Sequence, residues 1–283
     1  MRNEAVRFRI QKCRSLGEAS ELLAAANGDG KVLAGGQSLG PMLNLRLARP
    51  KLLVNIKRAS DFRRLEADDR VFAIGAGWTH AEIEDGVLED PTRGLLRFVA
   101  HGIAYRAIRN RGTIGGSLAH ADPAADWVST LAALGATIVV QGSGTEVTQR
   151  RYAAETFVEG AFTTKLAETD VIAAIEVPRL SAGAEWAYYK VCRKTGEFAN
   201  AIGVVILDPK IGLSRVLAGA TDGPPALLPR TAARLAESGA ATAATIVADE
   251  LRGALPHLDV DAQELHAVAV SRALARLGKE QHR

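Results

Sequence analysis

Two short glycine-rich segments contain the residues best suited to binding a ligand. The first reads Ala34-Gly35-Gly36-Gln37-Ser38-Leu39, and the second reads Thr113-Ile114-Gly115-Gly116-Ser117-Leu118. Adjacent glycines allow positive φ angles and lack the Cβ atom that would keep a ligand away from the backbone. Successive N–H groups in such a turn can point into one concavity and bind an anion. Two such loops, each after a short apolar run, predict a ligand with two phosphates, such as a dinucleotide.

A helix is expected to follow the second loop. Asp122 is suited to cap it and Pro123 to occupy its first turn. The N-terminus of that helix would place a positive partial charge where phosphate is expected to lie. Considered alone, the two loops are equally well explained as tight turns that bind nothing.

Ser38 also lies in a different catalytic pattern. The segment Gly36-Gln37-Ser38-Leu39-Gly40 matches the G-x-S-x-G motif that holds the nucleophilic serine of α/β-hydrolases. Against this interpretation, Pro41 follows immediately, and no aspartate-then-histidine pair follows in a convincing context. A serine hydrolase that uses Ser38 remains an alternative function, and it predicts that Ser38→Ala abolishes ester cleavage.

Two further patterns are weaker. Gly75-Ala76-Gly77-Trp78-Thr79-His80 nearly matches the dinucleotide motif G-x-G-x-x-G, but His80 replaces the third glycine, which favours a structural turn. The spacing of His120, Asp122 and Asp126 would suit a divalent metal. We expect Asp126 instead to accept hydrogen bonds from ribose or from the edge of a flavin ring. The sequence predicts neither a metal site nor a catalytic side chain.

The periodicity of apolar residues predicts a mixed α+β first part, up to about residue 177, and a small antiparallel sheet backed by helices after it. The segment Thr79-His80-Ala81-Glu82 fits a capping box, which predicts that a helix begins there. The expected strands are 31–34, 52–56, 71–74, 137–141, 171–177, 186–192, 201–207 and 213–218, and the expected C-terminal helices are 228–237, 243–255 and 262–277.

Composition limits the possible functions. The 283 residues include 35 Lys and Arg against 32 Asp and Glu, a net charge of +3 without a dense basic tract, so no nucleic-acid partner is predicted. No apolar stretch approaches the roughly 18 residues of a membrane span, and a cytoplasmic location is expected. Only Cys13 and Cys192 are present. An iron–sulfur cluster usually needs about four thiolates, so this chain cannot hold one.

Taken together, the motifs resemble those of a known family. Residues 31–39, the following Leu45-Arg46-Leu47-Ala48-Arg49-Pro50, and the longer stretch 111–126 are similar to the two motifs of the FAD-binding (medium) subunit of molybdenum hydroxylases. That family includes xanthine dehydrogenase and aerobic carbon monoxide dehydrogenase. The resemblance covers nearly the whole chain. It implies an α+β fold: a two-lobed FAD-binding domain of the vanillyl-alcohol-oxidase (PCMH) type over 1–177, with the lobe boundary near 57, and a C-terminal α+β domain of the carbon monoxide dehydrogenase flavoprotein type over 178–283.

The resemblance also implies how FAD is bound. Asp126 would contact FAD, Ile172 would pack against the flavin, and Lys190 would lie near the isoalloxazine ring, where a cation raises the flavin potential. Glu197 departs from the family pattern, since many relatives carry aspartate there. The residues implied for the two pyrophosphate loops are Val32, Leu33, Ala34, Gly35, Gly36, Gln37, Ser38 and Leu39 in the first, and Thr113, Ile114, Gly115, Gly116 and Ser117 in the second.

The same resemblance implies a division of labour between subunits. A large molybdenum-pterin subunit would oxidise the substrate, and a small subunit would carry two [2Fe–2S] clusters. Electrons would pass through FAD on this chain to an external acceptor, within a doubled heterotrimer. The two cysteines agree with clusters held elsewhere. A self-contained FAD oxidase and a nucleotide-binding regulatory module without redox chemistry stay open as alternatives.

Overall fold

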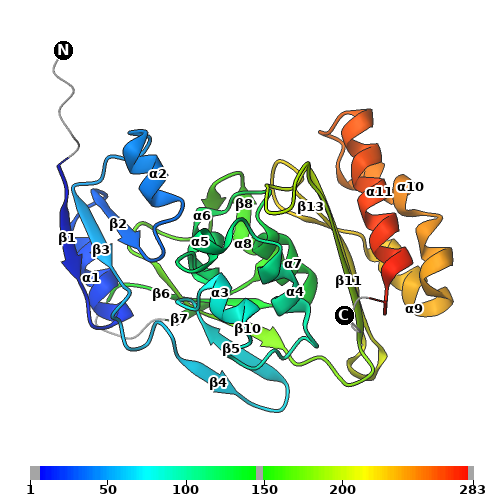
Figure 1. Cartoon of the computed structure of the whole chain (residues 1–283), viewed down its shortest axis with the longest axis horizontal. Helices are drawn as coiled ribbons and strands as arrows, with labels where there is room; N and C mark the ends of the chain where they lie inside the picture. Colours follow the sequence, from blue (N-terminus) through cyan, green and yellow to red (C-terminus); the bar gives the residue numbers. More distant parts are fainter. Residues whose placement is uncertain (1–6, 145–148, 280–283) are drawn as a thin grey trace.

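The computed structural model describes residues 7–144 and 149–279 and shows three layers that follow one another along the long axis (Figure 1). A three-stranded parallel sheet forms the N-terminal layer, a five-stranded antiparallel sheet the middle layer, and a four-stranded antiparallel sheet the C-terminal layer. Three helices, α9 to α11, cover the outer face of the last sheet (Figure 1). The α+β class predicted from periodicity is confirmed.

The N-terminal layer carries the first glycine loop. Its strands are β1 (Arg9–Lys12), β2 (Gly30–Leu33) and β3 (Leu52–Asn55), in the order β1-β3-β2. Helix α1 (Leu16–Ala25) begins at Ser15, whose hydroxyl accepts a hydrogen bond from the Glu18 N–H. Strand β2 leads into the loop, and the short helix α2 (Leu39–Asn44) follows it. The loop therefore lies at the carboxyl end of a strand.

The middle layer is built around β10, which pairs with β5 on one side and β6 on the other. A capping box at Thr79 starts α3, as the sequence predicted. The strands in sheet order are β4 (Leu65–Ala67), β5 (Val71–Gly75), β10 (Val171–Pro178), β6 (Thr137–Gln141) and β7 (Gln149–Ala153), and a separate hairpin joins β8 (Val158–Gly160) to β9 (Thr163–Thr164). The helices of this layer are α3 (His80–Glu84), α4 (Leu95–His101), α5 (Arg106–Arg109), α6 (Ile114–His120), α7 (Asp126–Leu134) and α8 (Ala154–Phe157).

Helix α7 lies between the middle layer and the C-terminal sheet. All nine of its residues are buried, including Ser129 and Thr130. The helix packs on β12 and β13, and a Cβ added to Gly219 would come within 1.9 Å of the Ser129 Oγ. Packing on both sides explains why the helix is buried all round.

The C-terminal layer confirms the three predicted antiparallel strands and adds a fourth. They are β11 (Glu185–Val191), β12 (Ala201–Asp208), β13 (Leu213–Gly219) and β14 (Ala226–Leu227). Because side chains alternate across a sheet, Val204 and Ile206 join the main core while Val205 faces the helices. Those helices are α9 (Pro229–Ala244), α10 (Val247–Ala254) and α11 (Val260–Arg276).

The main hydrophobic core runs through all three layers. It includes Leu52 in the first layer, Ile74 in the second and Trp186 in the third. Strand β10 ends at Pro178 and β11 begins at Glu185 in a different sheet, so the sheets change near the predicted boundary. The division into domains at 177 stays a prediction. Within residues 7–144 and 149–279, no helix is long and apolar enough to span a membrane.

Candidate functional site

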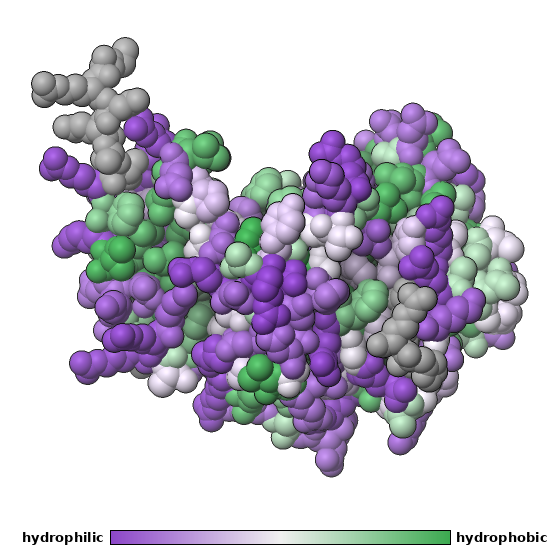
Figure 2. All heavy atoms as spheres, in the orientation of Figure 1, coloured by the Kyte–Doolittle hydropathy of each residue, from purple (hydrophilic) through white to green (hydrophobic). Residues whose placement is uncertain are grey.

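A large cavity lies where the layers meet. Its volume is about 1300 Å³, and both glycine loops contribute to its wall. The upper rim of the molecule dips between the N-terminal lobe and the rest (Figure 2). Segments far apart in the chain line it: 30–39 from the first layer, 112–126 and 162–170 from the second, and 190–200 from the third. Its volume exceeds the roughly 300–1,000 Å³ of most ligand sites, so the cavity is large enough for a dinucleotide.

The first loop presents its backbone to the cavity. Gly36 has a φ of 74°, a conformation that favours glycine. The Gln37 side chain donates to the Gly35 carbonyl at 3.2 Å, which fixes the turn. Within the described part of the chain, the N–H groups of Gly36, Gln37 and Ser38 donate to no acceptor. Three successive free amides are suited to an anion.

The second loop differs from the prediction. The GG pair lies in the first turn of α6, and Thr113 is the residue that caps it, accepting from the Gly116 N–H at 3.0 Å. The amides of Ile114, Gly115 and Ser117 donate to protein carbonyls. Because these N–H groups already have partners, this loop offers its hydroxyls and a surface free of side chains rather than a second set of free amides.

The helix expected after Asp122 also begins elsewhere. Asp122 accepts from the Ala124 N–H at 2.9 Å and so closes a turn rather than capping a helix. Ala121 ends α6 in the left-handed conformation, and α7 starts only at Asp126, after Ala125. The correction has a simple cause: α6 occupies the chain up to His120, so residues 121–125 must reverse direction before α7 can begin.

The two loops touch through their glycines. A Cβ added to Gly35 would lie 2.2 Å from the Arg111 carbonyl oxygen and 2.8 Å from the Gly112 Cα. Neither contact leaves room for a side chain at residue 35. Behind the second loop, a Cβ on Gly115 would lie 2.4 Å from the Ala76 Cβ, so Gly115 packs on the protein and faces away from the ligand space.

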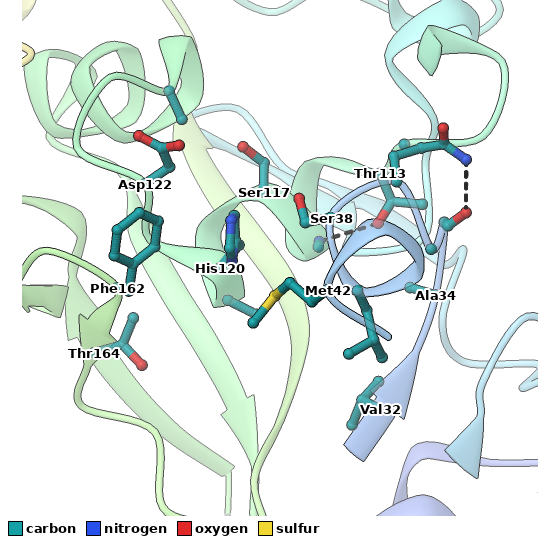
Figure 3. Close-up of a pocket in the computed structure, with 18 of the residues that line it drawn as sticks. Val32, Ala34, Ser38, Met42, Thr113, Ser117, His120, Asp122, Phe162 and Thr164 are labelled. Carbon is teal, nitrogen blue, oxygen red and sulfur yellow. Dashed lines mark hydrogen bonds between the residues drawn. The ribbon is translucent and has the colours of Figure 1, made fainter. Parts of the chain in front are cut away.

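Most of the predicted site residues line this one cavity. In the close-up, Ser38, Ser117 and Thr113 surround one space, with Val32 and Met42 on one side (Figure 3). Ile114, Gly115 and Ile172 are buried in the protein and do not line the cavity, and neither does Leu33. The predicted residues that line it are Val32, Ala34, Gly35, Gly36, Gln37, Ser38, Leu39, Thr113, Gly116, Ser117, Asp126 and Lys190.

Asp126 and Lys190 form a buried ion pair at one end of the cavity. The Lys190 Nζ lies 3.0 Å from both carboxylate oxygens, and the Tyr188 hydroxyl donates to Asp126 at 2.7 Å. Burial raises the pKa of Asp126, and the charge of Lys190 opposes that rise. Burial and the neighbouring Asp126 raise the pKa of Tyr188 well above its ordinary value. The positive charge of Lys190 is therefore largely balanced by the carboxylate of Asp126.

His80 is a cavity residue that sequence reasoning assigned only to a structural turn. Its ring is 5% exposed, and its Nδ1 accepts the indole N–H of Trp127 at 3.0 Å. Burial, with a smaller contribution from the charge of Arg109, lowers the pKa of His80 to about 4. The imidazole is thus neutral with its proton on Nε2. A Cβ on Gly112 would lie 2.8 Å from that atom, so glycine is needed there too.

Three exposed aromatic residues at the cavity were also missed. Tyr105, Phe162 and Phe198 line it and are 61–68% exposed. Phe162 stacks near His120, with ring centroids 5.1 Å apart. Nothing in the local pattern distinguishes such residues from surface aromatics, because tertiary packing alone brings them to one rim.

The structure gives neither competing motif the geometry that its chemistry needs. Gly77 packs on the ring of Phe62, and Gly75 on the backbone of Arg64, so the near-match to G-x-G-x-x-G is the structural turn that was predicted. Ser38 lines the cavity, but no histidine of the described chain hydrogen-bonds its hydroxyl. The base that a serine nucleophile requires is therefore missing from this geometry.

Comparisons with known proteins show the family to which the chain is similar. Residues 6–180 match the family described as FAD binding domain in molybdopterin dehydrogenase. The chain is 33% identical over 285 residues to the carbon monoxide dehydrogenase medium chain of Hydrogenophaga pseudoflava, covering 95% of this chain and 98% of that one. It is 37% identical over 203 residues to the 6-hydroxypseudooxynicotine dehydrogenase complex subunit alpha of Paenarthrobacter nicotinovorans, covering 71% and 68%. A solved structure of carbon monoxide dehydrogenase from Hydrogenophaga pseudoflava, lacking the Mo-pyranopterin moiety of the molybdenum cofactor, matches with a TM-score of 0.84 at 31% identity, covering 95% and 96%.

The contact between the loops predicts opposite effects at two neighbouring glycines. Gly35→Ala forces a methyl group against the Arg111 carbonyl and is expected to lower the free energy of unfolding by about 1–3 kcal/mol. Gly40→Ala lies in α2 with nothing within 4 Å and is expected to be neutral or stabilising by up to about 1 kcal/mol. Urea unfolding of both variants checks this, and a Gly35→Ala midpoint equal to wild type would contradict the close contact.

The neutral state of His80 predicts a loss of stability in mild acid. Between pH 6.5 and about 4, His80 is protonated in the unfolded chain but stays neutral in the folded one. Because the unfolded state binds the extra proton, the free energy of unfolding falls as the pH falls. At pH 5 the loss is about 2 kcal/mol relative to pH 7.5. His80→Gln keeps an acceptor for Trp127 but cannot titrate, and is expected to show less acid destabilisation by that amount. Equal losses in both proteins, measured by urea unfolding, would refute the assignment.

Proposed function

Since the chain belongs to the family of FAD-binding medium subunits of molybdenum hydroxylases, we propose that its cavity holds one FAD with the diphosphate at the glycine loops. The free amides of Gly36, Gln37 and Ser38 are the observation that carries this placement. The hydroxyls of Thr113 and Ser117 face the same space from the second loop (Figure 3).

The cavity fits the cofactor by shape as well as by chemistry. Gly36 lines the cavity with a positive φ, and an added Cβ would lie 3.2 Å from the Leu33 Cδ1, so a side chain there would strain the loop that forms this part of the wall. We propose that the adenine half lies toward Val32 and the segment 162–168, and the isoalloxazine ring toward Asp126 and Lys190. For Ile172, buried in the core, we propose a supporting role behind the wall.

Bound FAD supplies reversible electron transfer, and this chain supplies its binding and electrostatic environment. The chain is the FAD-binding electron-transfer subunit of a molybdenum hydroxylase, an oxidoreductase whose molybdenum-pterin and iron–sulfur groups lie on partner subunits. Cys13 is buried and Cys192 stands apart from the cavity wall. We propose that the assembly is a doubled heterotrimer of large, medium and small subunits, and that an external acceptor takes electrons from the FAD.

Both parts of the chain contribute to this proposed site. We propose an FAD-binding domain over 1–177, with lobes that meet near 57, and a C-terminal domain over 178–283 that contributes Lys190 and the loop around Phe198 to the ring end. The two relatives, one a medium chain and the other a subunit alpha, carry the names of different substrates, carbon monoxide and 6-hydroxypseudooxynicotine. Their difference supports substrate selection by the large subunit.

The purified chain tests the proposal directly. It is expected to take up FAD and show a flavin absorption spectrum, and acid-released cofactor should have the mass of FAD. In Gly36→Ala a residue with a Cβ must adopt a φ of 74° with that atom 3.2 Å from the Leu33 Cδ1, so the loop that carries the three free amides is strained and FAD affinity should fall at least tenfold, by about 1.4 kcal/mol or more. Gly212→Ala is the matched control, because Gly212 also has a positive φ of 67° but lies in open space.

The two glycines separate backbone strain from loss of the cofactor. Both variants should lose a similar amount of stability, and only Gly36→Ala should lose FAD. Wild-type FAD affinity in Gly36→Ala would contradict the assignment of the diphosphate to the first glycine loop. Bleaching of the flavin by substrate in the chain alone, without partners, would instead support a self-contained oxidase.

The Asp126–Lys190 pair predicts how the flavin potential responds to charge. Lys190→Met removes a positive charge and leaves a buried carboxylate, so the potential is expected to fall, since the reduced flavin carries more negative charge. The double variant Lys190→Met with Asp126→Asn removes both charges and should lie closer to wild type. Redox titration of the bound FAD measures the potential of both variants. An unchanged potential in Lys190→Met would show that the Asp126–Lys190 pair does not lie near the flavin ring.

A further inference from the structure

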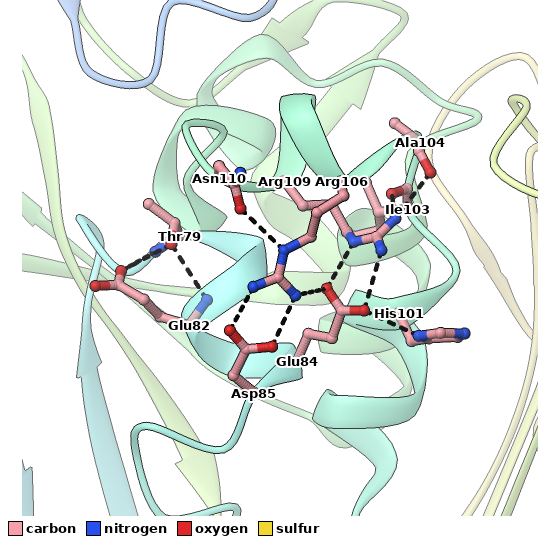
Figure 4. A network of polar contacts seen from close by, with 10 residues as sticks. All are labelled: Thr79, Glu82, Glu84, Asp85, His101, Ile103, Ala104, Arg106, Arg109 and Asn110. Atoms are coloured by element: carbon pink, nitrogen blue, oxygen red, sulfur yellow. Dashed lines mark hydrogen bonds and ion pairs between the residues drawn. The ribbon is translucent and has the colours of Figure 1, made fainter.

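Arg109 is a buried arginine that does not line the cavity. Its guanidinium is 10% exposed and forms a two-bond pair with Glu84, at 2.7 and 3.0 Å (Figure 4). The same guanidinium donates through Nη1 to the carbonyls of Ile103, at 3.0 Å, and Ala104, at 2.9 Å. A buried charge with this many partners holds them in one arrangement, because leaving any of them unpaired is costly.

Glu84 is the centre of a wider ionic network (Figure 4). It also contacts the His101 ring, at 2.9 Å, and the Arg106 guanidinium, at 2.9 Å, and Arg106 pairs with Asp85. Burial alone would raise the pKa of Glu84, but the hydrogen bonds from Arg109 and His101 hold it below its ordinary value. The carboxylate is therefore ionised and available to anchor Arg109.

The carbonyls that Arg109 holds belong to a strained turn. Ala104 has a φ of 43°, a left-handed conformation that costs energy for a residue with a Cβ. Such a turn persists only where its surroundings fix it. The two hydrogen bonds from Arg109, one to each side of the turn, supply that restraint.

A loop from the C-terminal layer rests on this turn. Ile103 and Gly196 form an isolated parallel bridge. Gly196 has a φ of 89°, and a Cβ added to it would lie 2.7 Å from the Ala104 carbonyl oxygen. That oxygen is one of the two that Arg109 holds. The cavity wall includes Ile103, Ala104 and Tyr105 on the turn and Gly196, Glu197 and Phe198 on the loop.

We propose that Arg109 is a positioning residue for the cofactor: held by Glu84, it fixes the 103–105 turn through the Ile103 and Ala104 carbonyls, and this turn supports the 193–200 loop that forms the ring end of the cavity wall. The inference rests on the proposed function, because it takes FAD as the occupant. Arg109 acts through the turn and the loop, which together form that part of the wall.

Arg106 provides a matched control. It shares Glu84 with Arg109 and adds Asp85, but it donates to neither carbonyl of the turn. If the network only braced α3 against α5, Arg106→Gln and Arg109→Gln would affect the cavity alike. If Arg109 seats the loop, only Arg109→Gln affects it.

Hydrogen–deuterium exchange of the full cofactor-free chain tests the contact between the 103–105 turn and the 193–200 loop without depending on FAD. Arg109→Gln is expected to speed exchange in both 103–105 and 194–200, whereas Arg106→Gln leaves 194–200 as in wild type. In the FAD-loaded chain, Arg109→Gln should release FAD about tenfold faster than wild type, and Arg106→Gln within about twofold. The FAD content of the wild-type chain tests the proposed function separately.

Gly196→Ala approaches the same contact from the other side and keeps the buried ions intact. Its methyl group collides with the Ala104 carbonyl, so faster exchange in 194–200 and faster FAD release are expected while peptides around Glu84 stay protected. This variant decides the matter if Arg109→Gln does not fold. Wild-type exchange in 194–200 together with wild-type FAD release in the folded variants would overturn the proposal.

Discussion

The contact between Gly35 and the Arg111–Gly112 peptide is the constraint on which the site depends. Backbone meets backbone at this point, and a single Cβ on Gly35 would overlap a carbonyl oxygen. The contact brings a loop at the end of a parallel strand against the start of α6, although about 75 residues separate them. On the other side of Gly112 lies the His80 ring, again without room for a Cβ. Three pieces of the chain therefore converge through glycine, and the first loop, whose amides at 36–38 have no acceptor within the described residues, lines the cavity beside them.

Helix α7 transmits this arrangement to the far end of the cavity. It is buried on every side between two sheets, which fixes its rotation. Asp126, its first residue, therefore faces the cavity and pairs with Lys190 of the C-terminal sheet, while the next residue, Trp127, points to His80 and holds that ring in one tautomer. The buried charges and the neutral imidazole cost free energy in isolation, and their pairing offsets it. Asp126, Lys190 and His80 therefore contribute both to the packing of the fold and to the wall of the cavity.

The sequence predicted those parts of the fold that depend on residues close together in the chain. The strand before the first loop, the capping box at Thr79 and the antiparallel strands of the C-terminal sheet were all legible, because turn residues and alternation act over a few positions. Other features depend on residues far away in the chain. Thr113 caps a helix that contains the glycine pair, and Gly115 of that pair packs against Ala76; because this helix runs to His120, Asp122 lies in the turn after it. Helix α7 is buried all round because a second sheet covers it. The role of His80 and the clamp of Arg109 on Ala104 emerge only when α3, α5 and the second loop are assembled. The family resemblance supplied the site residues that spacing alone left open.

A crystal structure of the chain with bound FAD tests the central claim most directly. The account predicts diphosphate oxygens about 3 Å from the amide nitrogens of Gly36, Gln37 and Ser38, between the first loop and the hydroxyls of α6. A diphosphate bound elsewhere, with those three amides facing water, would contradict it.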